Sequence, residues 1–344
     1  MYDLLSMYPD ELRALAVSMG QKAFRGDQIF EWIYKGADSF DKMTNLPSAF
    51  IAQLDKTCFI GRLGIQRKLV SKTDGTVKYL FEMADGECVE TVFMRYKHGN
   101  SVCVSTQAGC RMGCSFCAST VGGFRRNLEP SEILLQVMTA ERDTGEKVSN
   151  IVLMGIGEPL DNYDNVLKFL RIVNLEKGMN IGMRHISLST CGLVDRIEML
   201  AKENLQITLS VSLHACNDER RRAIMPIANK WSYDQLLAAC ENYEKQTGRR
   251  ISFEYALISG VNDSDADAAE LGKRLKGTLC HVNLIPVNPV AERSYRKSDR
   301  ARTESFVKTV SGFGISTTVR RKLGSDIDAS CGQLRAEHAH GSNG

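Results

Sequence analysis

The spacing of apolar residues changes twice along the chain. Over residues 8 to 20, apolar positions recur every three or four residues, which predicts a helix that begins at Pro9 and ends before Gly20. Ile29 and Ile33 repeat this spacing and predict a second helix. The chain is therefore predicted to begin with a small helical unit.

From about residue 63 to 97 the period falls to two, which is typical of strands. Val77, Tyr79 and Phe81 occupy every second position in this stretch. Two Asp-Gly pairs supply hairpin turn signals, at Asp74-Gly75 and Asp85-Gly86. The segment is predicted to be an antiparallel meander.

From residue 102 onward, short β-rich runs alternate with helical patterns. Such alternation predicts parallel strands joined by helical crossovers, and six units would form an open, partial (β/α)6 barrel. Barrels of this kind carry their chemistry at the C-terminal strand ends. Strands are predicted near residues 102–106, 150–155, 185–190, 206–212, 251–256 and 281–286, with a last strand around 315–320.

The chain is long enough for one large α/β domain with an appendage. Its predicted parts are a helical N-terminal domain, an antiparallel β extension, the partial barrel, and a C-terminal segment with a small, polar, disordered tail. In that order they span residues 1–60, 61–101, 102–322 and 323–344.

Composition narrows the possible settings of the protein. Residues are 43% hydrophobic and 25% charged, which is ordinary for a soluble globular protein. No apolar run approaches membrane-spanning length and the first residues do not resemble a signal peptide, so we expect a cytoplasmic protein with no membrane contact. The net charge of +3 is mildly basic, so any nucleic-acid surface must be local.

Three of the eleven cysteines form the most informative motif. Cys110, Cys114 and Cys117 are spaced C-x3-C-x2-C, and Gly109 and Gly113 allow the backbone to fold tightly around one metal centre. Zinc sites and ordinary iron–sulfur sites take four protein ligands, whereas a 4Fe-4S cluster held by three thiolates keeps one iron open. A zinc knuckle that borrows a distant ligand, or three buried thiols, are the alternatives.

Small and polar residues follow several predicted strands. Gly155, Gly157 and Glu158 lie in the sequence MGIGEP, where glycines let a ligand approach the backbone and a carboxylate can pair with an amino group. Serine or histidine at a strand end can also donate hydrogen bonds to a ligand, although such residues are more often satisfied by core neighbours. These further positions are Ser189, Ser212 to His214, and Asn288 between two prolines.

Two other cysteines stand apart from the motif. Cys331 lies in the polar, glycine-containing segment DIDASCGQL, where a thiolate can accept a methyl group, and Cys103 precedes the first motif cysteine by seven residues. The others are predicted to be buried as small hydrophobic side chains: Cys58, Cys88, Cys191, Cys216, Cys240 and Cys280.

The motif and the sequence around it resemble the RlmN/Cfr family of RNA adenine methyltransferases, within the radical S-adenosylmethionine (SAM) superfamily. The resemblance covers about residues 8 to 335 and rests on VETVFMRY, CVSTQAGCRMGCSFCAST, VLMGIGEPLDN, SLSTCG, SVSLHACNDERRRAIMPI, NLIPVNP and DIDASCGQL. It implies methylation of carbon 2 of a 23S rRNA adenosine in the peptidyl-transferase centre, and of the tRNA adenosine at position 37, just 3′ of the anticodon. The implied cofactors are a 4Fe-4S cluster and two SAM molecules per turnover.

The resemblance also implies roles for individual residues. Cys331 would carry the methyl group, Cys103 would release the product by forming a transient disulfide bond with it, and Glu90 would accept the ring proton. Nothing near Glu90 in the sequence marks it, because a glutamate in a strand usually faces solvent. Cys110, Cys114 and Cys117 would hold the cluster. The implied SAM contacts are Gly157, Glu158, Ser189, Ser212, Leu213, His214 and Asn288.

Several basic runs are candidates for contact with RNA phosphates, although such runs are usually only solvated. A target base must leave its stack to react, so single-stranded or opened RNA is expected. The family also implies an RNA-binding N-terminal domain, a flavodoxin as electron donor, and a monomer. The candidate contacts are Lys22, Arg25 and Lys35; Arg125 and Arg126; Arg220 to Arg222; Arg293, Arg296, Lys297 and Arg300; and Arg320 to Lys322.

Three alternatives remain on sequence grounds. A Cfr-like enzyme would methylate carbon 8 and confer antibiotic resistance; Pro159 after Gly-Glu favours the carbon-2 family, since Cfr-like sequences tend to have alanine there. A non-catalytic RNA-binding protein with a zinc knuckle would contain zinc and have no need of Cys331. An electron carrier is disfavoured by the open iron site and the large barrel.

Overall fold

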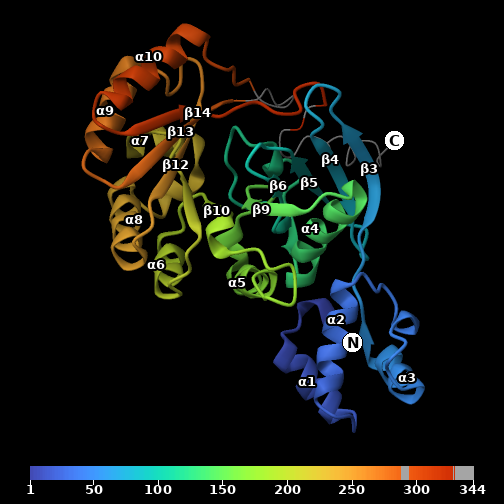
Figure 1. Ribbon diagram of the computed structural model, residues 1–344. Helices are drawn as coiled ribbons and strands as arrows, with labels where there is room; N and C mark the ends of the chain where they lie inside the picture. The colour runs from blue at the N-terminus through green and yellow to red at the C-terminus, as the bar shows by residue number, and fades with distance from the viewer. Residues whose placement is uncertain (288–293, 328, 330–344) are drawn as a thin grey trace.

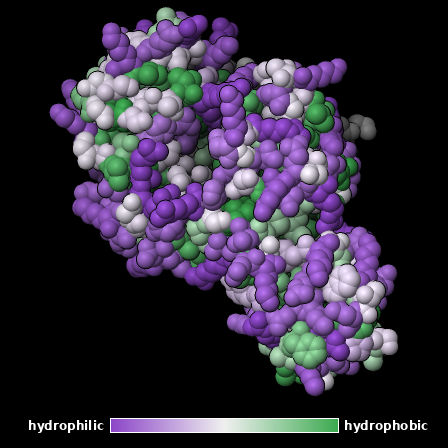
Figure 2. Space-filling model, viewed as in Figure 1, coloured by the Kyte–Doolittle hydropathy of each residue, from purple (hydrophilic) through white to green (hydrophobic). Residues whose placement is uncertain are grey.

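The computed structural model describes residues 1–287, 294–327 and 329. It has a small helical unit at the N-terminus and a larger α/β body, joined by strand β3 (Figure 1). Among the described residues, no helix is both long and apolar enough to cross a bilayer. On the face in Figure 2 hydrophilic side chains predominate, and apolar ones lie scattered between them.

The N-terminal unit contains the two predicted helices and a third that the sequence pattern did not reveal. Gly26 in the second helix packs directly on the first, because a Cβ there would overlap the backbone of Arg13. The unit docks on the body through a hydrogen bond from the Ser131 amide to Ser6 Oγ (3.1 Å) and an ion pair of Lys168 with Glu11 (3.0 Å). The elements are β1 (Tyr2–Asp3), α1 (Pro9–Ser18), α2 (Phe24–Tyr34), α3 (Ser48–Thr57) and β2 (Cys58–Phe59), with β1 and β2 paired in parallel.

One ten-stranded sheet forms the body, in the order β14-β13-β12-β11-β10-β9-β6-β5-β4-β3. The strands from β6 to β14 are parallel, and those from β3 to β6 are antiparallel, so the predicted meander and barrel are continuous parts of one sheet. The strands are β3 (Gly64–Val70), β4 (Val77–Glu82), β5 (Cys88–Met94), β6 (Asn100–Cys103), β9 (Val148–Leu153), β10 (Ile186–Thr190), β11 (Thr208–Ser212), β12 (Ile251–Leu257), β13 (Cys280–Pro286) and β14 (Ser316–Val319).

Helical crossovers link the parallel strands and cover the outer side of the sheet (Figure 1). Their apolar faces and the strands share a continuous core, which confirms the predicted open α/β barrel. Along the chain, β6 is followed by a hairpin of two short strands, β7 (Gln107–Gly109) and β8 (Phe124–Asn127), which precedes the first of these helices. The helices are α4 (Pro130–Thr144), α5 (Tyr163–Val173), α6 (Val194–Lys202), α7 (Asp218–Ile224), α8 (Tyr233–Thr247), α9 (Asp265–Leu275) and α10 (Arg300–Ser311).

Candidate active site

A cavity of about 1460 Å³ opens at the C-terminal ends of the parallel strands. Each strand contributes its last residues or the loop that follows, because parallel strands end at the same edge of a sheet. This is the edge at which the sequence predicted the chemistry. The strand-end residues include Cys103, Gly155, Ser189, Ser212, Ala256, Val287 and Arg320.

The loop of residues 110–117, the cysteine loop, forms one wall of this cavity. Cys110, Cys114 and Cys117 all line it. Gly109 has a φ of 80°, and a Cβ there would collide with the Gly123 carbonyl, so only glycine fits this turn. Burial raises the pKa of the Cys110 thiol to about 12, and the charge of nearby Cys117 adds to that shift.

The donor set fits a metal cluster that takes three thiolate ligands from the protein. Within the described ranges, no three His, Cys, Asp or Glu side chains stand close enough together to hold a single metal ion, the three motif cysteines included. In a 4Fe-4S cluster each of these three thiolates would bind a different iron, so the cysteines need not converge on a single ion.

Side chains within the cysteine loop anchor it to the barrel. Ser115 Oγ lies 2.8 Å from the Tyr295 hydroxyl, which comes from the segment between β13 and α10. Phe116 meets the His214 ring edge-on, with 4.8 Å between ring centroids. These contacts tie the loop to two separate strand ends.

Glu158 is buried and connects two strand ends. Its Oε2 accepts a hydrogen bond from the Cys191 amide (2.7 Å), and its Oε1 accepts one from the Leu160 amide (3.0 Å). Burial raises the pKa of its carboxyl group. Gly157 has a φ of 103° and packs on Gln107, whose Oε1 accepts from the Glu158 amide (2.9 Å). Both Gly157 and Glu158 line the cavity.

The residues at the end of β11 divide between the cavity and the core. Ser212, the last residue of β11, and His214 line the cavity, as does Ser189 near the end of β10, whereas the Leu213 side chain is fully buried in the core. His214 Nδ1 accepts a hydrogen bond from the Ala256 amide (2.8 Å), and burial lowers its pKa to about 3, so the ring is neutral with its proton on Nε2. Asn288 lies outside the described residues.

Glu90 does not face solvent, contrary to what is usual for a strand glutamate. Its carboxylate is buried and pairs with the buried ammonium group of Lys78 on β4, with 3.1 Å between Nζ and Oε2. An alternating pattern is typical of a strand with one exposed face, whereas both faces of β4 are covered. Glu90 lies on the same face of β5 as Val92 and Met94, which line the cavity.

Cys103 ends β6 and is buried against the C-terminal segment. Its apolar neighbours include Met94, Leu323 and Ala329. Hydrogen bonds dock this segment on the turn between β3 and β4: Asp326 accepts from Ser71 Oγ (2.7 Å) and from the Lys72 amide (2.9 Å), and Asp74 accepts from the Gly324 amide (2.9 Å). The sequence showed only a turn here.

Cys331 lies outside the described residues, as does the predicted disordered tail. Because Cys331 is not among the described residues, its transient disulfide bond with Cys103 stays a prediction. The six cysteines expected in the core are all buried, which confirms that prediction.

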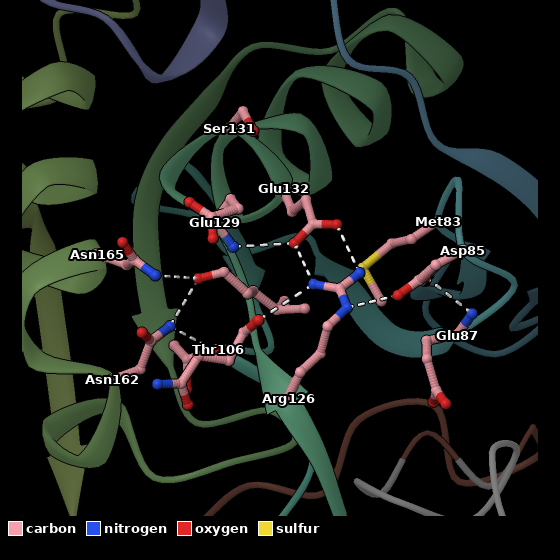
Figure 3. A network of polar contacts seen from close by, with 12 residues as sticks. Met83, Asp85, Glu87, Thr106, Arg126, Glu129, Ser131, Glu132, Asn162 and Asn165 are labelled. Carbon is pink, nitrogen blue, oxygen red and sulfur yellow. Dashed lines mark hydrogen bonds and ion pairs between the residues drawn. The ribbon is translucent and has the colours of Figure 1, made fainter. Parts of the chain in front are cut away.

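The basic runs separate into structural and exposed groups. Arg221 is fully buried, which excludes it from RNA contact; its Nη2 donates to the Cys191 carbonyl (2.5 Å). Arg220 pairs with Asp267 at 2.5 Å. Arg126 donates to both oxygens of Glu132 and to Asp85, and so pins the β7–β8 hairpin to the start of α4 (Figure 3). These arginines stabilise the fold.

A second basic group lines the cavity and is exposed to solvent; we name it the basic rim. It brings together two of the predicted runs, one before α10 and one after β14. Arg293 of the first run lies outside the described residues, and Arg125 lies off the cavity, 3.9 Å from Glu87. The basic rim consists of Arg296, Lys297, Arg300, Arg320, Arg321 and Lys322.

In the N-terminal unit, the candidate cations are engaged within the unit or stand on its surface. Arg25 donates to the Asn45 carbonyl (2.7 Å), and Lys35 lies 3.9 Å from Glu31. Lys22 is exposed. Their role in RNA binding stays a prediction.

Comparison with known proteins bears on both parts of the chain. A sequence model of the radical SAM superfamily matches residues 104–272, and one described as the ribosomal RNA large subunit methyltransferase N-terminal domain matches residues 2–60. A probable dual-specificity RNA methyltransferase RlmN of Clostridium acetobutylicum is 52% identical over 344 residues, the full length of both chains. The protein of the same description from Alkaliphilus oremlandii is 54% identical over 336 residues, 98% of each chain.

A solved structure extends the likeness to the backbone. The crystal structure of a radical SAM methyltransferase from Sphaerobacter thermophilus superimposes with a TM-score of 0.93 at 43% identity, over 98% of this chain and 100% of that one.

Proposed function

Because this chain belongs to the RlmN family of radical SAM RNA methyltransferases, we propose that it methylates carbon 2 of adenosine in 23S rRNA and at position 37 of tRNA. As a family member it is an RNA methyltransferase that uses a 4Fe-4S cluster and SAM. The observation that carries the proposal is the meeting of the cysteine loop, Glu158 and Cys103 in one cavity.

Cys110, Cys114 and Cys117 are the proposed cluster ligands. When bound, the cluster supplies the electron that activates SAM at its open iron. Phe116 and Ser115 keep the loop fixed against the barrel, so the ligand sulfurs stay at the strand ends. The buried surroundings exclude water from this chemistry.

SAM is proposed to lie across the strand ends beside the cysteine loop. Gly157 lines the cavity, and Glu158 offers a carboxylate to the amino group of SAM. Ser189, Ser212 and His214 line the adjoining wall and can donate hydrogen bonds to its polar groups. For Leu213 we propose a backbone contact, since its side chain is in the core, and Asn288 is proposed on the family motif.

The two thiols and Glu90 are proposed to work in sequence. The Cys331 thiolate takes a methyl group from SAM, whose sulfur leaves as a thioether. A radical derived from a second SAM removes a hydrogen atom from this methyl group, and the methyl carbon then bonds to C2 of the adenine. Glu90 accepts the ring proton. The Cys103 thiolate then attacks the Cys331 sulfur and forms an S–S bond; the product carbon keeps the electron pair of the broken S–C bond and takes up a proton, which completes the methyl group. Ala329, two residues before Cys331 in the sequence, packs against the apolar group that contains Cys103.

Residues 1–60 and the basic rim are proposed to hold the RNA, and a flavodoxin-type protein to supply electrons to a monomeric enzyme. The rim supports the first point, since its six cations stand at the mouth through which an extruded base would enter. The proposed flavodoxin-type electron donor rests on the analogy with the family. The RNA substrates place the reaction in the cytoplasm.

Nucleoside analysis tests the reaction. We expect rRNA and tRNA from cells that express the protein to contain 2-methyladenosine, and RNA from cells lacking the gene to lose it. Mass spectrometry with chromatographic standards separates 2-methyl from 8-methyladenosine. Formation of 8-methyladenosine, or of no methyladenosine, would overturn the proposed carbon-2 specificity.

The basic rim predicts a salt-dependent defect. Replacing Arg320, Arg321 and Lys322 by alanine should weaken RNA binding. The slope of log K against log salt should fall by about 0.7 to 0.9 for each phosphate that the variant no longer neutralises. Binding is measured by fluorescence anisotropy of a labelled RNA over a range of salt concentrations.

A charge-matched control uses Lys177, Lys202 and Arg250, which are exposed and do not line the cavity. Their replacement by alanine should leave the salt slope near that of the unmodified protein. Equal slopes for both triple variants would show that the rim does not contact phosphates.

A further inference from the structure

Lys78 and Glu90 form a fully buried ion pair in the antiparallel extension. Their side chains are 0% and 1% exposed, and 3.1 Å separates Nζ from Oε2. The main chain of Glu90 is also fixed, because Ser105 Oγ donates to its carbonyl at 2.7 Å and in turn accepts from the Ile156 amide at 3.0 Å. The carboxylate is thus held both by its charge and through its backbone.

Strand register places the pair on the cavity side of the sheet. Lys78 on β4 stands opposite Val92 on β5, and Leu80 stands opposite Glu90, so Lys78 and Glu90 are diagonal neighbours on one face. Val92, and Thr76 two residues before Lys78, both line the cavity. The pair therefore lies on the same face of the sheet as these two lining residues, with both of its own side chains buried.

A buried ion pair is a poor device for stability alone. Taking two charges out of water costs about as much as their attraction returns, and an apolar pair of similar volume often serves the fold as well or better. The Lys78 ammonium group lies on the face of the sheet that borders the cavity, next to Glu90, the proposed proton acceptor. Orientation of that acceptor gives the pair a role that an apolar pair cannot fill.

We propose that Lys78 is the positioning residue for Glu90, holding its carboxylate where the adenine ring proton leaves. This rests on the proposed function. In the step, the radical adduct gives up its unpaired electron to a one-electron acceptor of the iron–sulfur class, the C2–H bond breaks, an O–H bond forms on Glu90, and the electron pair of the C–H bond restores the aromatic purine ring. Lys78 keeps its own protons and fixes Oε2 throughout.

Lys78→Met removes the ammonium group at similar length. We expect kcat to fall by about 10²-fold, the cost of misplacing a reacting group by about 1 Å, with little change in KM. RNA with deuterium at carbon 2 of the target adenosine should then react more slowly than ordinary RNA, by a larger ratio than in the unmodified protein. A partly unfolded preparation lowers both rates equally and leaves this ratio unchanged.

Two further variants separate the inference from the proposed function. In a Glu90→Gln background, Lys78→Met should cause little additional loss, because both changes affect one step. If Glu90→Gln itself leaves the rate unchanged, the role of Glu90 fails. If it abolishes methylation while Lys78→Met changes neither kcat nor the isotope ratio, the role of Glu90 stands and that of Lys78 is overturned.

Lys68→Met is the matched control, since Lys68 on β3 also pairs with a carboxylate, Asp143 at 2.6 Å, and stands opposite Tyr79 rather than on the cavity face. Its isotope ratio should equal that of the unmodified protein. If Lys78→Met fails to fold, Lys78→Arg serves as the test. The guanidinium group keeps the positive charge but places its N–H donors differently from the lysine ammonium group. A wild-type kcat and isotope ratio in Lys78→Arg would then overturn the inference.

Discussion

Replacing Cys114 by alanine is expected to give a colourless protein that holds no iron–sulfur cluster and forms no methyladenosine. Cys114 lines the cavity with the other two motif cysteines. A cluster with one open iron takes three protein thiolates, so the loss of this thiol leaves one of its irons without a protein ligand. Iron and sulfide content, visible absorption after anaerobic reconstitution, and methyl transfer to RNA measure the effect.

Cys191→Ala is the control for this experiment. Cys191 lines the same cavity and belongs to the same apolar group as Cys114. Alanine removes its thiol contact with Glu158 but keeps the backbone amide that donates to Glu158. The variant should keep its iron and colour. Full iron content in the Cys114→Ala protein would contradict the cluster assignment. Zinc instead of iron in the unmodified protein would also contradict it and would favour the zinc knuckle.

Most of the architecture could be predicted because local signals and the fold agree. The hydrophobic period changes to two at about residue 63, where the antiparallel strands begin. Strand and helix patterns alternate after residue 102, as do the strands and helices of the barrel. The strand ends then follow from parallel topology. Helix α3 was not predicted, although Pro47 directly before it is compatible with a helix start.

Residues whose role depends on distant partners could not be predicted. Arg221 belongs to a run of three arginines that look equivalent in the sequence, but helix α7 turns it inward with Ile224 three residues later. Lys78 and Glu90 are twelve residues apart on two strands, and only the register brings them together. Docking of Asp326 on Ser71 joins segments 255 residues apart, which no local pattern encodes.

The extension between β3 and β5 links these findings. On its cavity face it carries the Lys78–Glu90 pair, and its first turn holds the C-terminal segment through Ser71 and Asp74. The parallel barrel and its loops carry the residues proposed to hold the cluster and SAM. We infer that the extension supplies the chemistry specific to methylation of an RNA base, by keeping the proton acceptor and the segment that leads to Cys331 beside the same cavity.

Replacing Cys103 by alanine is expected to accumulate protein covalently joined to RNA during turnover. In the proposed sequence, Cys331 is linked to the adenine through the methyl carbon, and only attack by a second thiolate on its sulfur frees the product. Cys103 ends β6 and belongs to the apolar group against which Leu323 and Ala329 of the C-terminal segment pack. Labelled RNA should therefore shift on a denaturing gel, and nuclease should remove the shift.

Two variants test the origin of that species. Cys103→Ala combined with Cys331→Ala should give no adduct, because the carbon link to RNA cannot form. Cys88→Ala removes a buried thiol from β5 in the same extension and should release product normally. Recovery of only free protein from Cys103→Ala, with product still formed, would assign release to another group. Adduct in the double variant would move the attachment point away from Cys331.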